Sequence, residues 1–168
     1  VPKIGTKATV NGEKSATAKG DITIEETVSY KNLTVGKEYT VKGILMDKAT
    51  GKPFLVNGKE VTSEVTFTAE KKDGEITVRF TFNGSAVTKQ TDIVVFETLY
   101  RDGVELAAHA DIEDGGQTVT LTPPAPSVPQ TGDNSNLGFW IGLGAVALGG
   151  IIAVVIIRVK ARKDEDDE

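Results

Sequence analysis

The side chains best suited to chemistry gather in one short segment that runs from His109 to Gln117. His109 is the only histidine of the 168-residue chain, and a neutral imidazole readily accepts a proton near neutral pH. Asp111 and Asp114 stand between His109 and Gln117, where they would either orient the imidazole or, as aspartates more commonly do, cap the turn. The segment indicates a general base beside an amide, although a lone histidine is more often a plain surface residue.

No cofactor motif accompanies these residues. Residues 111–116 are rich in acidic groups and glycine, but they lack the alternating ligands and the distal glutamate of an EF-hand loop. The sequence has no zinc-ligand spacing, no phosphate-binding glycine loop and no Gly-x-Ser-x-Gly elbow. We therefore expect neither a metal nor a cofactor.

Alternation of apolar and polar residues places further reactive groups on predicted strands. Thr6 shares one face of the opening strand with two apolar residues, so it should point inward while the neighbouring lysines face water. Glu26 falls on the apolar face of the run 22–30, where an unpaired carboxyl is costly and needs an explanation. Glu97 lies in a run that is apolar on both faces, so the pattern leaves its direction open.

The runs that carry these residues predict an all-β domain. Between residues 1 and 121 we expect about seven or eight short strands separated by turn signals, and no helical period appears before residue 137. This pattern is typical of an immunoglobulin-like β-sandwich with antiparallel sheets. Residues 65–67 and 76–82 should form a hairpin across the turn at 71–74, and the last strand should begin at Gln117.

Several of these residues occur together in a known family. The pattern His-x-Asp-x-x-Asp-x-x-Gln-Thr covers 109–118, Val-Val-Phe-Glu covers 94–97, Glu-Glu-Thr-Val-Ser-Tyr covers 25–30 and Ile-Gly-Thr-Lys-Ala-Thr covers 4–9. Together they resemble the Thr-Gln ester-bond domains, also described as VaFE repeats, of Gram-positive surface adhesins. The likeness runs along the whole of residues 1–121.

This resemblance implies a self-made covalent link from the Thr6 hydroxyl to the side-chain carbonyl of Gln117, with release of ammonia. His109 would activate the weakly nucleophilic hydroxyl as a base. Glu97 and Glu26 occupy the acid-pair positions of the family, where two carboxyls forced together share a proton and polarise the amide. The family leads us to expect Asp at the second position, and Glu26 is one methylene longer. Because the reaction happens once and consumes its own residues, the domain is not an enzyme.

A second signal lies near the C-terminus. Val128-Pro129-Gln130-Thr131-Gly132 precedes an uncharged run from Leu137 to Ile157, which is long enough to span a bilayer. A basic cluster at 158–163 follows at once and marks the cytoplasmic side of such a span. This order resembles the sorting signal of Gram-positive cell-wall proteins, whose usual motif is LPXTG, with valine here in place of leucine. It implies that a sortase attacks the Thr131 carbonyl and passes the acyl group to an amine; a plain single-pass membrane anchor is the alternative.

These signals divide the chain into four parts. We expect an ester-bond domain at 1–121, a proline-rich spacer with the sorting motif at 122–136, a transmembrane helix at 137–157 and a charged cytoplasmic tail at 158–168. The chain has 19 basic and 24 acidic residues, and this mildly acidic balance argues against nucleic acid as a partner. It has no cysteine, so a bond other than a disulfide would have to staple the domain. An exported protein needs a signal peptide, so we expect this to be the C-terminal piece of a longer protein.

The function predicted from these features is that of a structural stalk module in a surface adhesin or pilus-like protein. It would be anchored to the cell wall and embedded in the membrane only transiently. The expected partners are a sortase, an amine of peptidoglycan or of a pilin as covalent acceptor, the membrane before sorting, and a host surface ligand. The alternatives are a ligand-binding adhesin domain, a secreted hydrolase that uses Thr6, His109 and Glu97, and a domain with a Lys-Asn or Lys-Asp isopeptide bond.

Overall fold

The computed structural model describes residues 1–127, and β-strands dominate this part of the chain. Alternation explains the strands, because a period of two sends every second side chain to the interior. The strands are β1 (Lys3–Val10), β2 (Ser15–Thr17), β3 (Asp21–Lys31), β4 (Glu38–Asp47), β5 (Lys52–Pro53), β6 (Leu55–Val56), β7 (Lys59–Glu60), β8 (Thr62–Thr68), β9 (Gly74–Asn83), β10 (Thr91–Arg101), β11 (Val104–His109) and β12 (Thr118–Thr122). Two 3-10 turns, η1 (Gly84–Ala86) and η2 (Gly115–Gln117), complete the structure.

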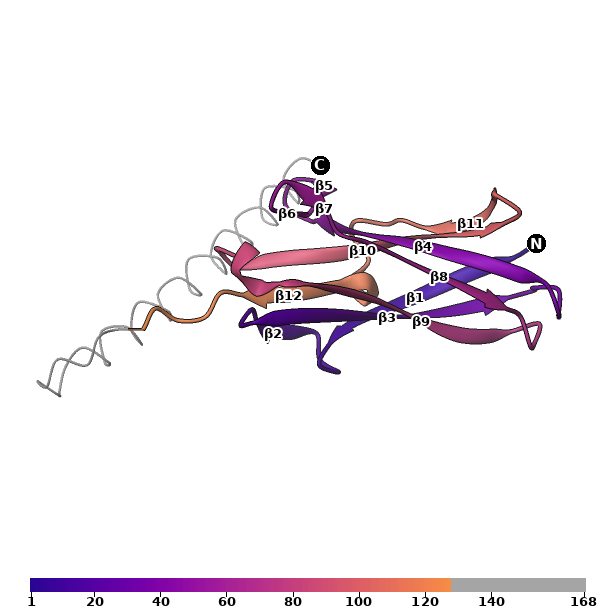
Figure 1. Cartoon of the computed structure of the whole chain (residues 1–168), viewed down its shortest axis with the longest axis horizontal. Coiled ribbons are helices and arrows are strands. Elements are labelled where there is room, and N and C mark those ends of the chain that lie inside the picture. Colours follow the sequence, from indigo (N-terminus) through magenta and orange to yellow (C-terminus); the bar gives the residue numbers. More distant parts are fainter. Residues whose placement is uncertain (128–168) are drawn as a thin grey trace, which may run out of the picture. The chain divides into compact units, whose positions relative to one another are not determined.

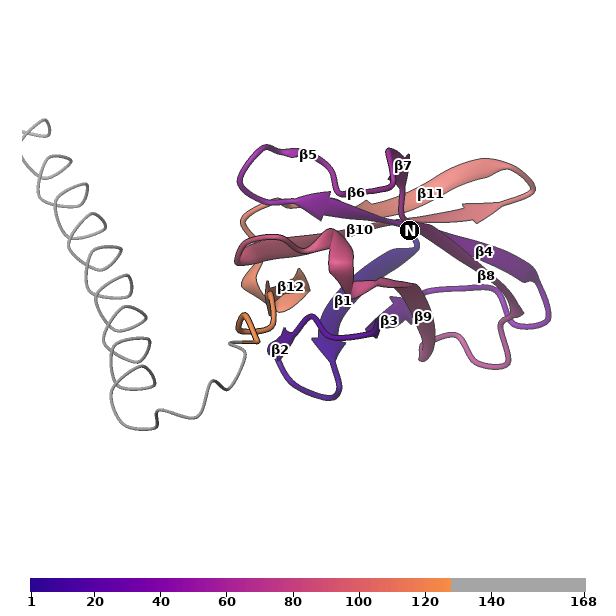
Figure 2. The same cartoon turned by 60° about the vertical axis from the view of Figure 1, so that its left-hand side comes forward.

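Two sheets form a β-sandwich (Figures 1 and 2). The smaller sheet has the strand order β1-β3-β9 and is antiparallel throughout. The larger sheet has the order β2-β12-β10-β4-β5, with β11 also paired to β10 and β8 to β4. Strands β2 and β12 are parallel, and β6 and β7 form a separate two-stranded hairpin. The all-β sandwich predicted from the sequence is therefore confirmed.

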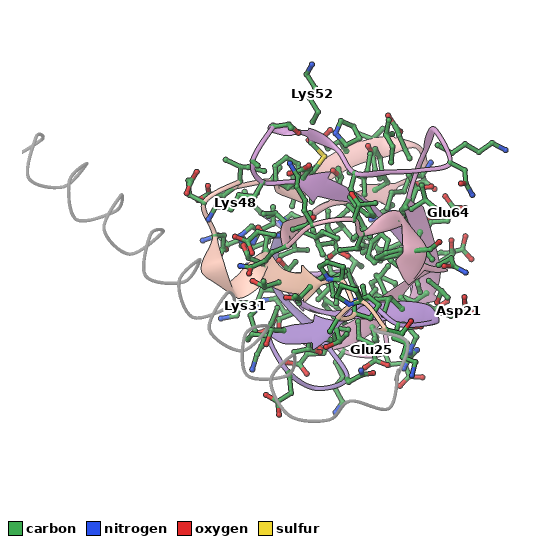
Figure 3. The ribbon with its side chains drawn as sticks, turned by 90° about the vertical axis from the view of Figure 1, so that its left-hand side faces the viewer. Asp21, Glu25, Lys31, Lys48, Lys52 and Glu64 are labelled. Carbon is green, nitrogen blue, oxygen red and sulfur yellow. The ribbon has the colours of Figure 1, made fainter. Side chains whose placement is uncertain are left out.

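Apolar side chains from both sheets fill the space between them. Ile24 and Phe80 come from the smaller sheet and Leu45 and Leu99 from the larger one, and all four are almost completely buried. Full burial of one such side chain contributes about 1.5–3 kcal/mol. The six charged residues labelled in Figure 3 lie around this core, whereas the side chains of Glu26 and Glu97 are buried. The compact unit that contains this core spans Val1–Ala125.

The chain enters and leaves the sandwich at opposite ends (Figure 1). The N-terminus lies at one end, where the backbone oxygen of Val1 accepts a hydrogen bond from Asn32 after β3, and the chain leaves β12 at the other end (Figure 1). Strand β1 belongs to the smaller sheet and β12 to the larger sheet. A bond between these two strands would therefore join the two sheets as well as the two ends of the domain.

The predicted hairpin between residues 65–67 and 76–82 is wrong. Strand β8 pairs with β4, whereas β9 pairs with β3, so the connection between β8 and β9 crosses from one sheet to the other. A strand with one buried face shows alternating apolar and polar residues in either of two cases. The neighbouring strand in the chain can be hydrogen-bonded to it in the same sheet, or it can lie in the facing sheet. The sequence analysis also missed β11, and Gln117 lies in η2, immediately before the last strand.

The predicted transmembrane helix at 137–157 and the charged tail lie outside the described residues. Within residues 1–127, no helix is long and apolar enough to cross a membrane.

Candidate functional site

Glu26 lies in the middle of the smaller sheet, with its side chain completely buried. Its strand, β3, is the central strand, and the cross-strand neighbours of Glu26 are Ala8 on β1 and Val78 on β9. Both neighbours are apolar and fully buried, so the carboxyl has no water beside it. The inward direction that alternation predicts for Glu26 is the one observed.

Glu97 lies on the facing strand of the larger sheet and is 1% exposed. Glu97 belongs to β10, and its cross-strand neighbours are Gly43 of β4 and His109 of β11. A methyl group added to Gly43 would lie 2.5 Å from Cζ of Phe80 and 3.2 Å from Oε1 of Glu97. The absence of a side chain at Gly43 thus leaves the room that the Glu97 carboxyl and the Phe80 ring occupy. The structure settles the direction of Glu97, which the sequence pattern left open.

Burial raises the pKa of both carboxyls above the usual range of a glutamate. Burial raises the pKa of Glu26 to about 8, while the Thr6 hydroxyl and the charge of Lys14 oppose the rise. Burial also raises the pKa of Glu97 to about 9, and the nearby Glu26 adds to this rise. Both carboxyls are therefore largely protonated at neutral pH, in the form that can donate a hydrogen bond to a carbonyl oxygen.

Thr6 and the turn that carries Gln117 lie close to each other. Thr6 lies two residues before Ala8 on the same face of β1, so it is a diagonal neighbour of Glu26, and its hydroxyl lowers the pKa of that carboxyl. A methyl group added to Gly116, the residue before Gln117, would lie 3.8 Å from the Thr6 carbonyl oxygen. The Gln117 side chain is fully buried, and its Nε2 donates a hydrogen bond of 3.3 Å to the backbone oxygen of His109.

The oxygens of these four residues share an unusual property. Within residues 1–127, buried side-chain oxygens without a hydrogen-bond partner occur only on Thr6, Glu26, Glu97 and Gln117. They are Thr6 Oγ1, both carboxyl oxygens of each glutamate, and Gln117 Oε1. A buried polar group without a partner costs about 1–3 kcal/mol, so such atoms are rare in a settled core. Their concentration in one place indicates a reactive site.

His109 is paired with an acidic residue at the edge of the site. Its Nε2 lies 2.7 Å from Oδ2 of Asp114, and the two side chains are 27% and 29% exposed. The hydrogen bond to His109 lowers the pKa of Asp114. Oδ1 of Asp114 accepts a hydrogen bond of 2.7 Å from the Gly116 N–H, and so fixes the turn that carries Gln117. Asp114 therefore both orients the imidazole and caps the turn.

Asp111 has a purely local contact. Its Oδ1 accepts a hydrogen bond of 3.0 Å from the backbone N–H of Glu113, and its backbone oxygen accepts one of 3.2 Å from Asp114 N–H. These bonds close the turn between β11 and η2. Of the two aspartates considered from the sequence, Asp114 thus contacts the histidine and Asp111 caps the turn.

Lys14 is a member of this neighbourhood that the sequence analysis missed. Its ammonium donates hydrogen bonds to the backbone oxygens of Ala8, at 2.7 Å, and Gly116, at 2.9 Å. The turn signal Asn11-Gly12 indicates where the chain reverses before Lys14, but no local pattern indicates which distant carbonyls a long side chain will reach.

The pentapeptide Val128 to Gly132 lies outside the described residues. Within residues 1–127, no three ligand-type side chains are grouped to hold a metal.

The arrangement is suited to an acyl transfer within the chain. A hydroxyl, a primary amide and two carboxyls with raised pKa values have buried oxygens, and a partly exposed histidine lies at the edge of this group. The fold and the site together define a β-sandwich domain with a buried hydroxyl oxygen on its first strand and a buried amide just before its last strand.

The chain belongs to the family of T-Q ester bond containing domains, whose model matches residues 2–121. The resemblance to ester-bond domains is therefore confirmed, whereas the sorting signal stays a prediction. The structure is similar to that of a bacterial adhesin from Mobiluncus mulieris that contains intramolecular disulfide, isopeptide and ester bond cross-links, in two crystal forms. The TM-score is 0.63 in both, at 21% and 22% identity, and the alignment covers 73% of this chain. This chain spans 57% of the length of that adhesin structure. No protein with a curated description gives a significant match.

Proposed function

We propose that residues 1–121 form a structural stalk module of a surface adhesin or pilus-like protein, locked by an ester between Thr6 and Gln117. The observation that carries this proposal is the set of buried oxygens without partners on Thr6, Glu26, Glu97 and Gln117. Two of these residues are the alcohol and the amide that an ester would consume, and the other two are the acids that would assist the reaction.

The proposed step conserves all atoms and involves no oxidation. The Thr6 Oγ attacks Cδ of Gln117 and its proton passes to a base; the Cδ–Nε2 bond then breaks and the nitrogen leaves as ammonia with that proton. The protonated carboxyls of Glu97 and Glu26 would donate hydrogen bonds to the amide oxygen and stabilise the charge that develops on it. The Asp114 carboxylate accepts the hydrogen of His109 Nε2, so in the neutral ring Nδ1 keeps a lone pair that can accept a proton.

The mechanical consequence follows from the connection of the strands. Tension entering at the N-terminus would run along β1 to Thr6, cross the ester to Gln117 and leave along β12, so the residues between them would carry no load. The bond would close a loop of about 110 residues. The unfolded state would lose conformational entropy worth about 5 kcal/mol, and the folded state would be stabilised by that amount. A domain without cysteine would gain a staple comparable to a disulfide.

The remaining parts of the proposal rest on the sequence. We place the module in an immunoglobulin-like class of sandwich, outside the cell, with its C-terminal segment read by a sortase and joined to an amine of peptidoglycan or of a pilin. We also propose a host surface ligand as a partner. The chemistry is a single event, so no turnover on external esters or amides is expected.

The test is the intact mass of the full chain, purified in a mild detergent, beside a Thr6→Val variant that keeps the shape of the side chain. The wild type should be lighter than its sequence by one ammonia, and the variant should have its full mass. The variant should also melt roughly 20 °C lower, since about 5 kcal/mol is lost from a domain of this size. Cleavage of the wild type by hydroxylamine would separate an ester from an isopeptide bond, which survives this treatment. A wild type of full mass would refute the proposal.

A further inference from the structure

Lys14 connects the two segments that the proposed ester would join. Residues 11 and 12 form a tight turn, with positive φ at both Asn11 and Gly12 and reciprocal hydrogen bonds between the backbones of Val10 and Glu13. This turn directs the next residue, Lys14, back toward η2. The backbone oxygen of Lys14 then accepts a hydrogen bond of 2.9 Å from Thr120 N–H on β12.

The side chain of Lys14 makes the second half of the connection. One of its hydrogen bonds goes to Ala8 on β1, two residues after Thr6, and the other to Gly116 in η2, the residue before Gln117. Strands β1 and β12 belong to different sheets and share no ladder within residues 1–127. The ammonium of Lys14 therefore supplies a direct polar bridge between the strand of the nucleophile and the turn of the electrophile.

The charge of Lys14 acts on the same site. Its pKa is lowered by burial and by the neighbouring Lys7, whereas attraction to Glu26 and to Asp114 raises it. In return, the positive charge of Lys14 lowers the pKa of Glu26, whereas the negative charge of Asp114 raises it. The field of Lys14 thus makes the Glu26 carboxyl easier to ionise than burial alone would.

We propose that Lys14 is a positioning residue for ester formation, because its ammonium holds the turn that carries Gln117 against the strand that carries Thr6. This inference rests on the proposed function. The clamp limits the relative motion of two residues that must come into contact, and loss of such positioning slows a reaction without touching the reacting atoms. Arginine keeps the charge and several donors, so it should retain the clamp in part.

The experiment compares the rates of ester formation in four chains. The full-length wild type, Lys14→Met, Lys14→Arg and the control Lys19→Met, which alters an exposed lysine of the β2–β3 connection, are isolated unfolded in denaturant with detergent. Each is diluted into native buffer between pH 5 and 9, and the loss of one ammonia is followed by intact mass. Thermal unfolding is measured for each substitution in the Thr6→Val background, where no cross-link forms.

The expected result is a rate about tenfold lower for Lys14→Met, from the loss of charged hydrogen bonds, with Lys19→Met like the wild type. Lys14→Arg should recover most of the rate. Without the positive charge the pKa of Glu26 rises further, so the alkaline limb of the rate profile should move to higher pH in Lys14→Met and return in Lys14→Arg.

Three results would overturn the proposal. Wild-type rate and pH profile in Lys14→Met would show that the clamp has no role, while ester formation itself stands. A lower rate in Lys14→Met that is uniform in pH, not recovered by arginine and matched by a lower melting temperature would show that the residue only supports the fold. A wild type that loses no ammonia under any condition would refute the proposed function, and the inference with it.

Discussion

The buried carboxyls should make the uncross-linked domain less stable as the pH rises. In the folded state the pKa of Glu97 is about 9, against 4.5 for an ordinary glutamate, so between these values the folded state binds a proton that the unfolded state has released. Stability contributed by this proton is present below about pH 4.5 and is lost progressively as the pH rises toward 9. Glu26, with a pKa of about 8, acts in the same direction.

The size of the effect follows from these values. Between pH 5 and 7, Glu97 alone lowers the free energy of unfolding by about 3 kcal/mol, because each pH unit corresponds to about 1.4 kcal/mol. For a domain of this size, the melting temperature should fall by roughly 10 °C over the same range. The Thr6→Val variant is the appropriate chain for the measurement, since no ester can form in it.

The assay is calorimetric unfolding of three chains at pH 5, 6 and 7. Adding Glu97→Gln to Thr6→Val replaces the protonated carboxyl by a neutral amide of similar shape, and should remove about 3 kcal/mol from the pH dependence. Adding Glu25→Gln instead is the matched control, because Glu25 is the exposed neighbour of Glu26 and pairs with Arg79 at 3.0 Å. If the pH dependence is the same with and without Glu97→Gln, the carboxyl is not buried in its protonated form and the reasoning fails.

Two further substitutions test the geometry of the site, each with a control from the same chain. Gly43→Ala would bring a methyl group to 2.5 Å from the Phe80 ring, and such overpacking should cost about 1–3 kcal/mol and lower the melting temperature. Gly5→Ala, whose methyl group would meet nothing within 4 Å, should melt like the parent chain. Equal melting temperatures for the two variants would contradict the contact. Asp114→Asn should slow ester formation about tenfold or more because the imidazole loses its carboxylate partner, whereas Asp111→Asn should leave the rate unchanged. Intact mass followed over time measures both rates. Equal rates in the two variants would show that the contact between Asp114 and His109 has no role.

A large part of the site could be predicted from the sequence because local alternation decides which way a strand residue points. Thr6 and Glu26 each follow a clear period of two, and both point inward in the structure. His109, Asp114 and Gln117 are close in the chain, and the structure has them at the end of β11, at the cap of η2 and in η2. These relations depend on residues close together in the chain, so no knowledge of the sheets was needed.

The pairing of strands and the meeting of faces depend on the whole fold. The run that contains Glu97 is apolar on both faces, and only the packing of Phe80 beside Gly43 shows which face encloses the carboxyl. The predicted hairpin between β8 and β9 is wrong for a related reason: alternation shows that a strand has an inner face but not which strand lies beside it.

The sequence by itself therefore determined a β-sandwich domain with an inward threonine and an inward carboxyl, because side-chain direction in a strand is a local property. Only the tertiary structure decided that Glu26 and Glu97 approach each other and that Lys14 bridges β1 to η2. The physical reason is that these contacts join segments about 70 to 100 residues apart, and they form only when the two sheets pack face to face.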